Sequence, residues 1–193
     1  MNRITINILF GILIWSSVPG YLQAQRFGLP GVQNFSRSDY HGGTQNWAVV
    51  QAENGMMYFG NNNGLIEFDG AHWTVYNDLE LVIRSLCADD NRIYVGAFNA
   101  FGYYEENQNG TLKYHSLLPM LENRFNDFDE IWRIHKTSFG IVFQSFKAIF
   151  IYRDNKIDIV YPPSRFHFSY IVNGELWVCD ETRGLMQYRE GKL

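Results

Sequence analysis

A hairpin pattern that recurs four times constrains the fold of this chain more than any other feature. Each copy has a short apolar strand, a tight polar loop and a second strand that ends in an aromatic residue. The four copies span residues 55–68, 92–104, 140–152 and 174–188. Their anchor aromatics are Tyr58, Tyr94, Phe143 and Trp177, at spacings of 36, 49 and 34 residues. A period of about 40 residues predicts a repeat architecture.

Further strand-like segments flank the hairpins. An apolar strand precedes each hairpin, at 47–50, 83–88, 131–135 and 168–172. Another strand follows the first three hairpins, at 72–76, 112–116 and 156–161. Four antiparallel strands in about 40 residues are typical of a β-propeller blade. The predicted fold class is therefore all-β, a partial β-propeller of about four four-stranded antiparallel blades that is not closed.

Helices are disfavoured across the hairpins, because the turns cut the apolar runs to four or six residues. One stretch, 117–129, is a plausible helix, and as an insert between the second and third blades it explains the longest spacing. Glu190-Gly191 resembles the turn before a last strand, and the sequence ends two residues later. We therefore expect residues 45–193 to be the N-terminal blades of a longer propeller.

The first 24 residues have the pattern of a secretory signal peptide. Arg3 supplies a positive charge, residues 8–15 form an apolar core, and Pro19 breaks it before Ala24. We predict cleavage after Ala24, followed by a lead segment at 25–44. A retained membrane anchor is the alternative, although the apolar run is short for a hydrocarbon core of about 30 Å. The mature chain is expected to be soluble and exported, either secreted or on the periplasmic face of a membrane-anchored protein.

Charge and cysteine content exclude some partners. The chain has 16 Lys and Arg against 20 Asp and Glu, a net charge of −4, so it lacks the basic surface of a nucleic-acid binder. Contact with a membrane is expected only through C-terminal parts beyond this segment, and a homodimer is compatible with the sequence. An oxidising compartment would allow Cys87 and Cys179 to form a disulfide. We favour two buried, unpaired thiols, because the two strands are placed two repeats apart.

Catalytic chemistry is not indicated. The sequence has no nucleophile elbow, zinc motif, phosphate loop or dinucleotide fingerprint, so we expect no enzyme activity, no cofactor and no metal site. Asp127, Asp129 and Glu130 form an acidic cluster that is a calcium site or, more simply, a solvated loop. The strand tryptophans Trp47, Trp73, Trp132 and Trp177 are interpreted as packing between blades, with ligand stacking as the alternative.

The loops inside the hairpins are the predicted ligand-binding positions. Equivalent loops of stacked repeats project from the same face, where amides, aromatics and mixed charges suit a small ligand such as a glycan or a peptide. The alternative is that they are ordinary turn residues with solvated side chains. The candidate residues are Asn61, Asn62, Asn63, Phe98, Asn99, Phe146, Lys147, Asp180, Glu181 and Arg183.

The repeats resemble the two-component regulator propeller family of bacterial sensor proteins. The segments 54–68 and 173–188 carry its pattern: an Asn-Gly turn, an aromatic strand, a short loop, Gly-Leu and an aromatic end. The third copy has Gln144 and Ala148 in place of the glycines. The opening is similar to a subfamily in which a periplasmic propeller precedes a three-tyrosine β-sandwich, a membrane helix and a cytoplasmic helix-turn-helix domain.

The resemblance implies a function as an extracytoplasmic ligand-sensing module of a signal-transduction and transcription-regulating protein, without the output domains of that protein. The alternative is a secreted glycan-binding or scaffolding propeller with no signalling role. A membrane helix and a DNA-binding domain encoded downstream would favour the first function.

Overall fold

The structure is a computed structural model that describes residues 31–77, 80–121 and 127–193. By its internal contacts the chain divides into two units, Met1–Asn34 and Phe35–Leu193. Of the first unit only residues 31–34 are described, and they are exposed and have no regular secondary structure. The predicted signal peptide and the start of the lead segment lie outside the described residues. The second unit contains every helix and strand discussed below.

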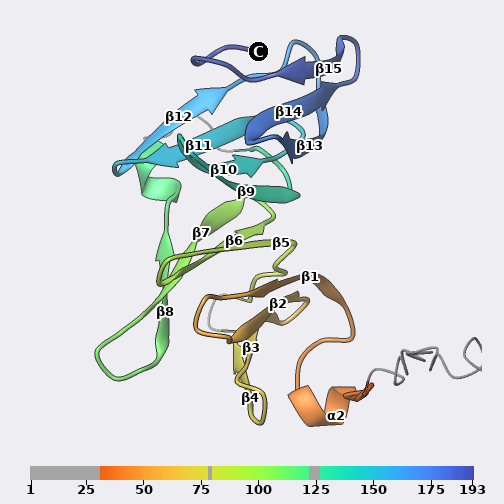
Figure 1. Cartoon of the computed structure of the whole chain (residues 1–193), viewed down its shortest axis with the longest axis vertical. Helices are drawn as coiled ribbons and strands as arrows, with labels where there is room; N and C mark the ends of the chain where they lie inside the picture. The colour runs from red at the N-terminus through yellow and green to blue at the C-terminus, as the bar shows by residue number, and fades with distance from the viewer. Residues whose placement is uncertain (1–30, 78–79, 122–126) are drawn as a thin grey trace, which may run out of the picture. The chain divides into compact units, whose positions relative to one another are not determined.

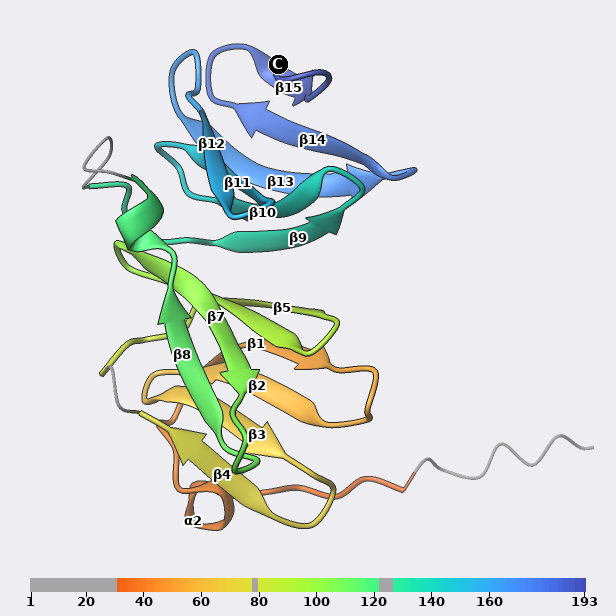
Figure 2. The ribbon, with the colours of Figure 1, turned by 90° about the vertical axis from the view of Figure 1, so that its left-hand side faces the viewer.

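Four antiparallel sheets follow one another along the second unit, and each is made of consecutive strands (Figures 1 and 2). A short helix, α2 (Arg37–Tyr40), precedes the first sheet. The first sheet comprises β1 (Asn46–Gln51), β2 (Met57–Asn61), β3 (Gly64–Phe68) and β4 (Trp73–Tyr76). The second comprises β5 (Ser85–Asp89), β6 (Arg92–Ala97), β7 (Ala100–Glu106) and β8 (Leu112–Ser116).

The third and fourth sheets repeat this order. The third comprises β9 (Arg133–Thr137), β10 (Gly140–Gln144), β11 (Ile149–Arg153) and β12 (Lys156–Val160). The fourth has three strands, β13 (Phe166–Val172), β14 (Glu175–Asp180) and β15 (Gly184–Gln187). The expected turn follows β15, where Arg189 and Lys192 exchange two backbone hydrogen bonds. The all-β fold class is confirmed, with four sheets that do not close into a ring.

Apolar residues fill the spaces between consecutive sheets, because alternate residues of each strand point to opposite faces. Tyr58 and Leu65 of the first sheet pack with Ile93 and Val95 of the second. Phe101 packs with Phe143 and Phe150 between the second and third sheets. Val142 and Ile149 pack with Leu176 and Val178 between the third and fourth. Each sheet therefore has a forward face, toward the next sheet in sequence, and a back face toward the previous one.

This alternation corrects one detail of the sequence alignment. Tyr58 and Tyr94 point forward, toward the second and third sheets respectively. Phe143, aligned with them by its aromatic character, instead points back toward the second sheet. The equivalent forward position in the third sheet is Val142. The aromatic pattern was therefore read one residue out of register in that repeat.

The insert between the second and third sheets has no α-helix where it is described. Over the described residues 117–121 and 127–129, the only regular element is a single 3-10 turn, η1 (Leu118–Leu121). Leu117, Leu121 and Phe128 are buried in the core between the two sheets. The insert therefore supplies apolar side chains to that core. Within the described residues of the stretch 117–129, the predicted helix is found only as this turn, and residues 122–126 lie outside the description.

Gly64 shows why the first hairpin needs a glycine. The two-residue loop is Asn62-Asn63, and Gly64 is the first residue of β3, with a φ of 105°. A Cβ atom at this position would lie 2.1 Å from the carbonyl oxygen of Tyr76 in β4. The glycine therefore permits both a left-handed backbone and the close approach of the outer strand.

Two further predictions concern the cysteines and the membrane. Cys87 and Cys179 are both free thiols, as predicted, but each is only half-buried. Burial, followed by the nearby Asp89, raises the pKa of the Cys87 thiol. Over the part of the chain that the structure describes, no helix is both long and apolar enough to span a bilayer.

Candidate functional site

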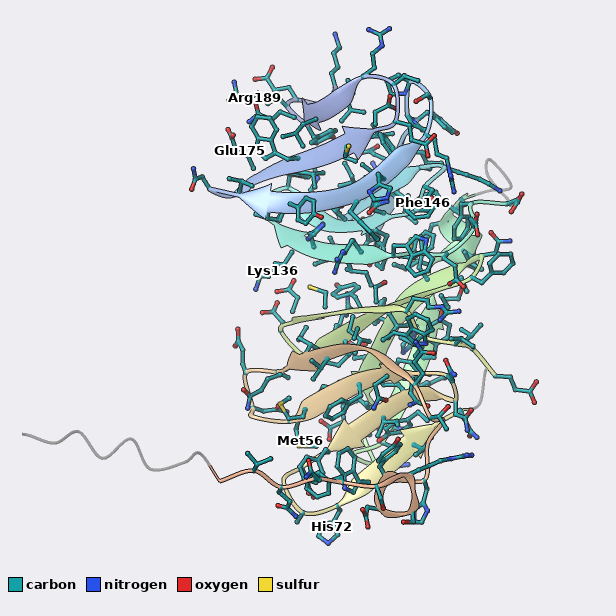
Figure 3. All side chains as sticks on the ribbon, turned by 90° about the vertical axis from the view of Figure 1, so that its right-hand side faces the viewer. Met56, His72, Lys136, Phe146, Glu175 and Arg189 are labelled. Atoms are coloured by element: carbon teal, nitrogen blue, oxygen red, sulfur yellow. The ribbon has the colours of Figure 1, made fainter. Side chains whose placement is uncertain are left out.

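The four hairpin loops lie along one edge of the sheets, because each contacts a connection between sheets. Asn61 accepts a backbone hydrogen bond from Ile83, and Asn99 donates one to Asp129. Phe146 accepts a backbone hydrogen bond from Phe166, and Glu181 donates one to Arg165. In Figure 3, Phe146 lies at this edge, opposite the edge that carries Met56, Lys136 and Glu175. The sequence-predicted residues are thus brought to one edge, which we call the loop edge.

Asn61, however, is completely buried. Its side-chain oxygen accepts a hydrogen bond from the backbone N–H of Gly43 at 2.6 Å. Its amide nitrogen donates to the carbonyl oxygens of Gly43 and Gln45, at 3.0 and 3.1 Å. The side chain fastens the lead segment to the first hairpin and is not part of the exposed loop surface.

Asp180 has the same role in the fourth sheet. Its carboxylate accepts hydrogen bonds from the backbone N–H groups of Ser164, Thr182 and Arg183, at 2.9 to 3.0 Å. Burial raises the pKa of this carboxyl, but the several hydrogen bonds together lower it well below its usual range. Asp180 therefore stays ionised and closes the loop onto the connection before β13.

The remaining candidates divide into paired and unpaired side chains. The side-chain oxygen of Asn99 accepts hydrogen bonds from the backbone N–H groups of Phe128 and Asp129, both at 2.8 Å. Lys147 and Glu181 form ion pairs with Asp127 and Arg165, respectively. Asn62 accepts a hydrogen bond from the indole of Trp47, at 2.7 Å. The candidates that are exposed, with no side-chain hydrogen bond or ion pair recorded within the described residues, are Asn63, Phe98 and Arg183.

A second set of side chains, which the loop argument did not include, lies at the starts of the innermost strands. Trp47, Arg84 and Trp132 occupy equivalent positions in the first three sheets, at or just before β1, β5 and β9. By the strand register His167 is the equivalent residue of β13, and Phe168 follows it directly. The strand register shifts around Trp47 and around Phe168, which is typical of β-bulges that redirect a side chain.

These side chains form a continuous row of aromatic and cationic groups. The guanidinium carbon of Arg84 lies 3.7 Å from the ring centroid of Trp47 and 5.9 Å from that of Trp132. The Trp132 ring stacks on Phe146 with centroids 5.7 Å apart. The Phe146 ring in turn stacks on His167, with centroids 5.9 Å apart and planes 5° apart. Phe146, like Asn62 through its hydrogen bond with Trp47, thus joins the loop edge to the row.

A hollow of about 500 Å³ lies beside this row, and we call it the inner-strand hollow. Its lining comes from the starts of β1, β5, β9 and β13 and includes Trp47, Arg84, Trp132, Arg133 and Phe168. The lining contains two arginines and no aspartate or glutamate. The volume and the mixture of aromatic and polar groups are typical of a small-ligand site.

Arg84 is held by two neighbours. Its Nε atom donates to Glu130 Oε1 at 3.2 Å, and its guanidinium lies against Trp47. Arg84 Nη1 and Glu130 Oε2 are buried atoms with no hydrogen-bond partner among the described residues. Because Glu130 pairs with Arg84, and Asp127 with Lys147, two of the three carboxylates of the predicted acidic cluster are bound to basic side chains.

A larger hollow of about 620 Å³ lies at the opposite edge, between the first two sheets. Its lining includes Glu53, Asp90 and Glu106, and its aromatic residue, Tyr58, is buried. This larger hollow has no exposed aromatic surface and no basic side chain in its lining. We therefore take the inner-strand hollow, which has both, as the candidate site.

His135 lines the inner-strand hollow and is neutral at pH 7. Burial is the main cause that lowers the pKa of this imidazole, and Arg133 contributes in the same direction. Its Nε2 atom lies 2.9 Å from the buried Ser169 hydroxyl. A hydrogen bond with the backbone of Ser169 opposes the shift only in part.

This shift predicts a pH dependence of stability. The unfolded chain, with an ordinary histidine pKa near 6.5, binds a proton more readily than the folded chain does. The free energy of unfolding should therefore fall as the pH is lowered through about 6.5, and His135→Gln should lessen this fall. Urea denaturation of the unmodified chain and the variant at about pH 7.5 and 5.8 measures this difference in the free energy of unfolding. The control is His72→Gln, since His72 is exposed. Equal pH dependence in all three proteins would contradict the assignment.

Sequence reasoning assigned Trp47 and Trp132 to packing between blades. The structure instead leaves 38% of Trp47 exposed and places both indoles in the lining of the hollow. Trp132 also precedes β9 and does not lie within it. The available signal was position, because each tryptophan stands at the start of the first strand of its repeat.

Comparison with known proteins supports the fold. No protein-family model matches the chain, and no curated protein matches its sequence. Among solved structures, the chain is similar to the extracellular domain of a Bacteroides thetaiotaomicron protein described as a one-component system, BT4673, with a TM-score of 0.57 and 14% identity. It is also similar to the WD40 β-propeller domain of Doa1, with a TM-score of 0.56 and 10% identity. The four sheets resemble propeller blades.

A protein of unknown function from Bacteroides caccae is also similar, with a TM-score of 0.50 and 12% identity. Each of these likenesses covers 76% of the chain. The chain spans 20% of the BT4673 structure, 52% of the Doa1 structure and 57% of the Bacteroides caccae structure. At these identities the comparisons establish the fold alone.

Proposed function

We propose that this chain is the ligand-sensing module of an extracytoplasmic signal-transduction protein, and that it binds a small ligand in the inner-strand hollow. The observation that carries the proposal is the row of Trp47, Arg84, Trp132 and Phe168 beside a hollow of about 500 Å³. Residues at the starts of the innermost strands of four successive sheets converge there, so one ligand would contact all four sheets. A ligand held in this way would alter how the sheets pack, which is a means of transmitting a signal.

Three further observations support an extracytoplasmic sensor. The repeats resemble those of bacterial sensor propellers, and the first 24 residues have the pattern of a signal peptide. The extracellular domain of BT4673 has a similar fold. We also propose that the chain is not an enzyme, since its sequence carries no nucleophile elbow, zinc motif, phosphate loop or dinucleotide fingerprint.

A binding experiment tests the location of the site. Oligosaccharide and peptide libraries are screened against the chain by the change in tryptophan fluorescence, and hits are measured by calorimetry. Trp132→Ala should weaken binding by about tenfold or more, because truncation of an aromatic residue at the centre of a binding site typically costs about 2 kcal/mol or more. Phe98→Ala is the matched control, since Phe98 is 56% exposed and does not line the hollow. Loss of binding in the Phe98 variant alone would place the ligand on the loops and overturn the proposed site.

Signalling is tested separately from binding. In the source bacterium, Trp132→Ala should abolish the transcriptional response to the identified ligand. If binding is lost but every transcript responds as before, the chain belongs to a secreted binding protein without a signalling role.

A further inference from the structure

The charge of the inner-strand hollow differs from that of the whole chain. The chain has a net charge of −4, yet the hollow is lined by two arginines without a carboxylate. Arg84 is paired with Glu130, and His135 is neutral because burial lowers its pKa. The uncompensated charge of the hollow therefore comes from Arg133.

Arg133 is suitably placed to meet an anionic group. It is exposed at the start of β9, and no ion pair of its guanidinium is found within the described residues. Its guanidinium carbon lies 5.1 Å from the ring centroid of Phe168. A planar guanidinium with free N–H groups binds a carboxylate or a sulfate through paired, charge-assisted hydrogen bonds.

The aromatic groups around Arg133 define the rest of the ligand. Trp47, Trp132 and Phe168 all line the hollow and are at least partly exposed. Flat aromatic faces of this kind pack against the C–H faces of sugar rings, whose hydroxyl groups point outward to water. An aromatic surface beside a free guanidinium therefore fits a ring compound that carries an anionic group.

We propose that the inner-strand hollow selects an acidic saccharide, with its ring on Trp132 and its anionic group on Arg133. The inference rests on the proposed function, because it names the ligand class of the same site. The anionic group is a uronate carboxylate or a sulfate ester, and the two share the chemistry that Arg133 recognises.

The test is calorimetry of the full chain with a defined panel of saccharides. The acidic probes are oligogalacturonate, alginate and hyaluronan oligomers, which carry only carboxylates, and chondroitin sulfate and heparin oligomers, which add sulfates. Each is compared with its carboxyl-reduced or desulfated form. At least one acidic probe should bind about tenfold more tightly than the form that lacks its carboxylates or its sulfates, and the form that loses affinity identifies the group.

Substitution of Arg133 ties this selectivity to the hollow. Arg133→Gln should weaken the binding of the acidic ligand by about 10- to 100-fold, as expected for the loss of a charge-assisted hydrogen bond. The affinity for the form that lacks the recognised anionic group should not change. Arg183→Gln is the control, since Arg183 is an exposed arginine that does not line the hollow. Unchanged circular dichroism and melting temperature verify that both variants fold.

The outcomes separate the two proposals. Neutral saccharides that bind as tightly as acidic ones, with loss on Trp132→Ala, would overturn the acidic selectivity and leave the proposed function standing. Unchanged affinity in Arg133→Gln, or binding of peptides alone, would also overturn it. If no probe of any class binds in a manner that depends on Trp132, the proposed function itself is wrong.

Discussion

Phe101→Ala is expected to lower the free energy of unfolding by about 3–5 kcal/mol. Phe101 is completely buried at the start of β7, between the second and third sheets. Its ring centroid lies 4.7 Å from that of Phe143, 5.0 Å from Phe150 and 5.4 Å from Phe128. Truncation would leave a cavity among three rings that come from the third sheet and from the insert. Because domains are stable by only about 5–15 kcal/mol, a loss of this size leaves a large fraction of the chain unfolded at modest urea concentrations.

Phe98→Ala is the matched control, three residues earlier in the same hairpin. Phe98 is 56% exposed, so its truncation should change the free energy of unfolding by no more than about 0.5 kcal/mol. Urea denaturation followed by tryptophan fluorescence measures both variants. A similar loss of unfolding free energy in the two variants would contradict the assignment of Phe101 and the three rings around it to the core between the second and third sheets.

The fold was predictable because the sequence repeats it. One hairpin, taken alone, is a short apolar segment of uncertain type, but four copies with the same turns restrict the choice to stacked sheets. The sequence of a single copy does not show which of its residues point to which face of the sheet. Phe143 matches the aromatic pattern, yet its neighbour Val142 occupies the forward position. The face that each residue takes depends on the sheet it packs against, and this is not visible in one repeat.

The loop edge was predictable for the same reason, but the use of its side chains was not. Repetition brings Asn61, Asn99 and Asp180 to one edge. Their hydrogen-bond partners, however, lie in connections that differ in length and sequence between repeats, such as Gly43 for Asn61 and Ser164 for Asp180. The sequence of a turn does not show whether its polar residue contacts a ligand or forms hydrogen bonds that close the loop. The inner-strand hollow was missed because β-bulges, which redirect Trp47 and Phe168, leave no distinct mark in the sequence.

The second large effect that we expect is self-association of the chain in solution. The forward face of the fourth sheet has no following sheet within the described residues, and Tyr170, Val172 and Leu185 on it are 51%, 49% and 64% exposed. The back face of the first sheet leaves Val49 58% exposed, although Phe35 packs on its outer part against Phe68 and Trp73. Exposed apolar faces of this kind promote association.

The occupant that we expect on each face is a second copy of the chain. All three interfaces between consecutive sheets pack a forward face on a back face, so the two free faces are of complementary types. Sedimentation analysis over roughly 1 to 100 µM should show an average mass that rises with concentration. Leu185→Lys should weaken association by about tenfold or more, because it places a charge in the contact. Phe98→Lys is the control, since it changes an exposed aromatic residue outside both faces.

Mixing two variants decides whether the contact is head-to-tail. Leu185→Lys blocks the forward face and leaves the back face free, and Val49→Lys does the reverse. Each variant alone should remain monomeric, because a forward-to-back contact needs both faces and every copy lacks one. An equimolar mixture should form a dimer and nothing larger, since the free back face of one variant accepts the free forward face of the other. A dimer formed by the Val49→Lys variant alone would show that forward faces pair with each other, and monomers at every concentration of the unmodified chain would show that neither face binds a copy.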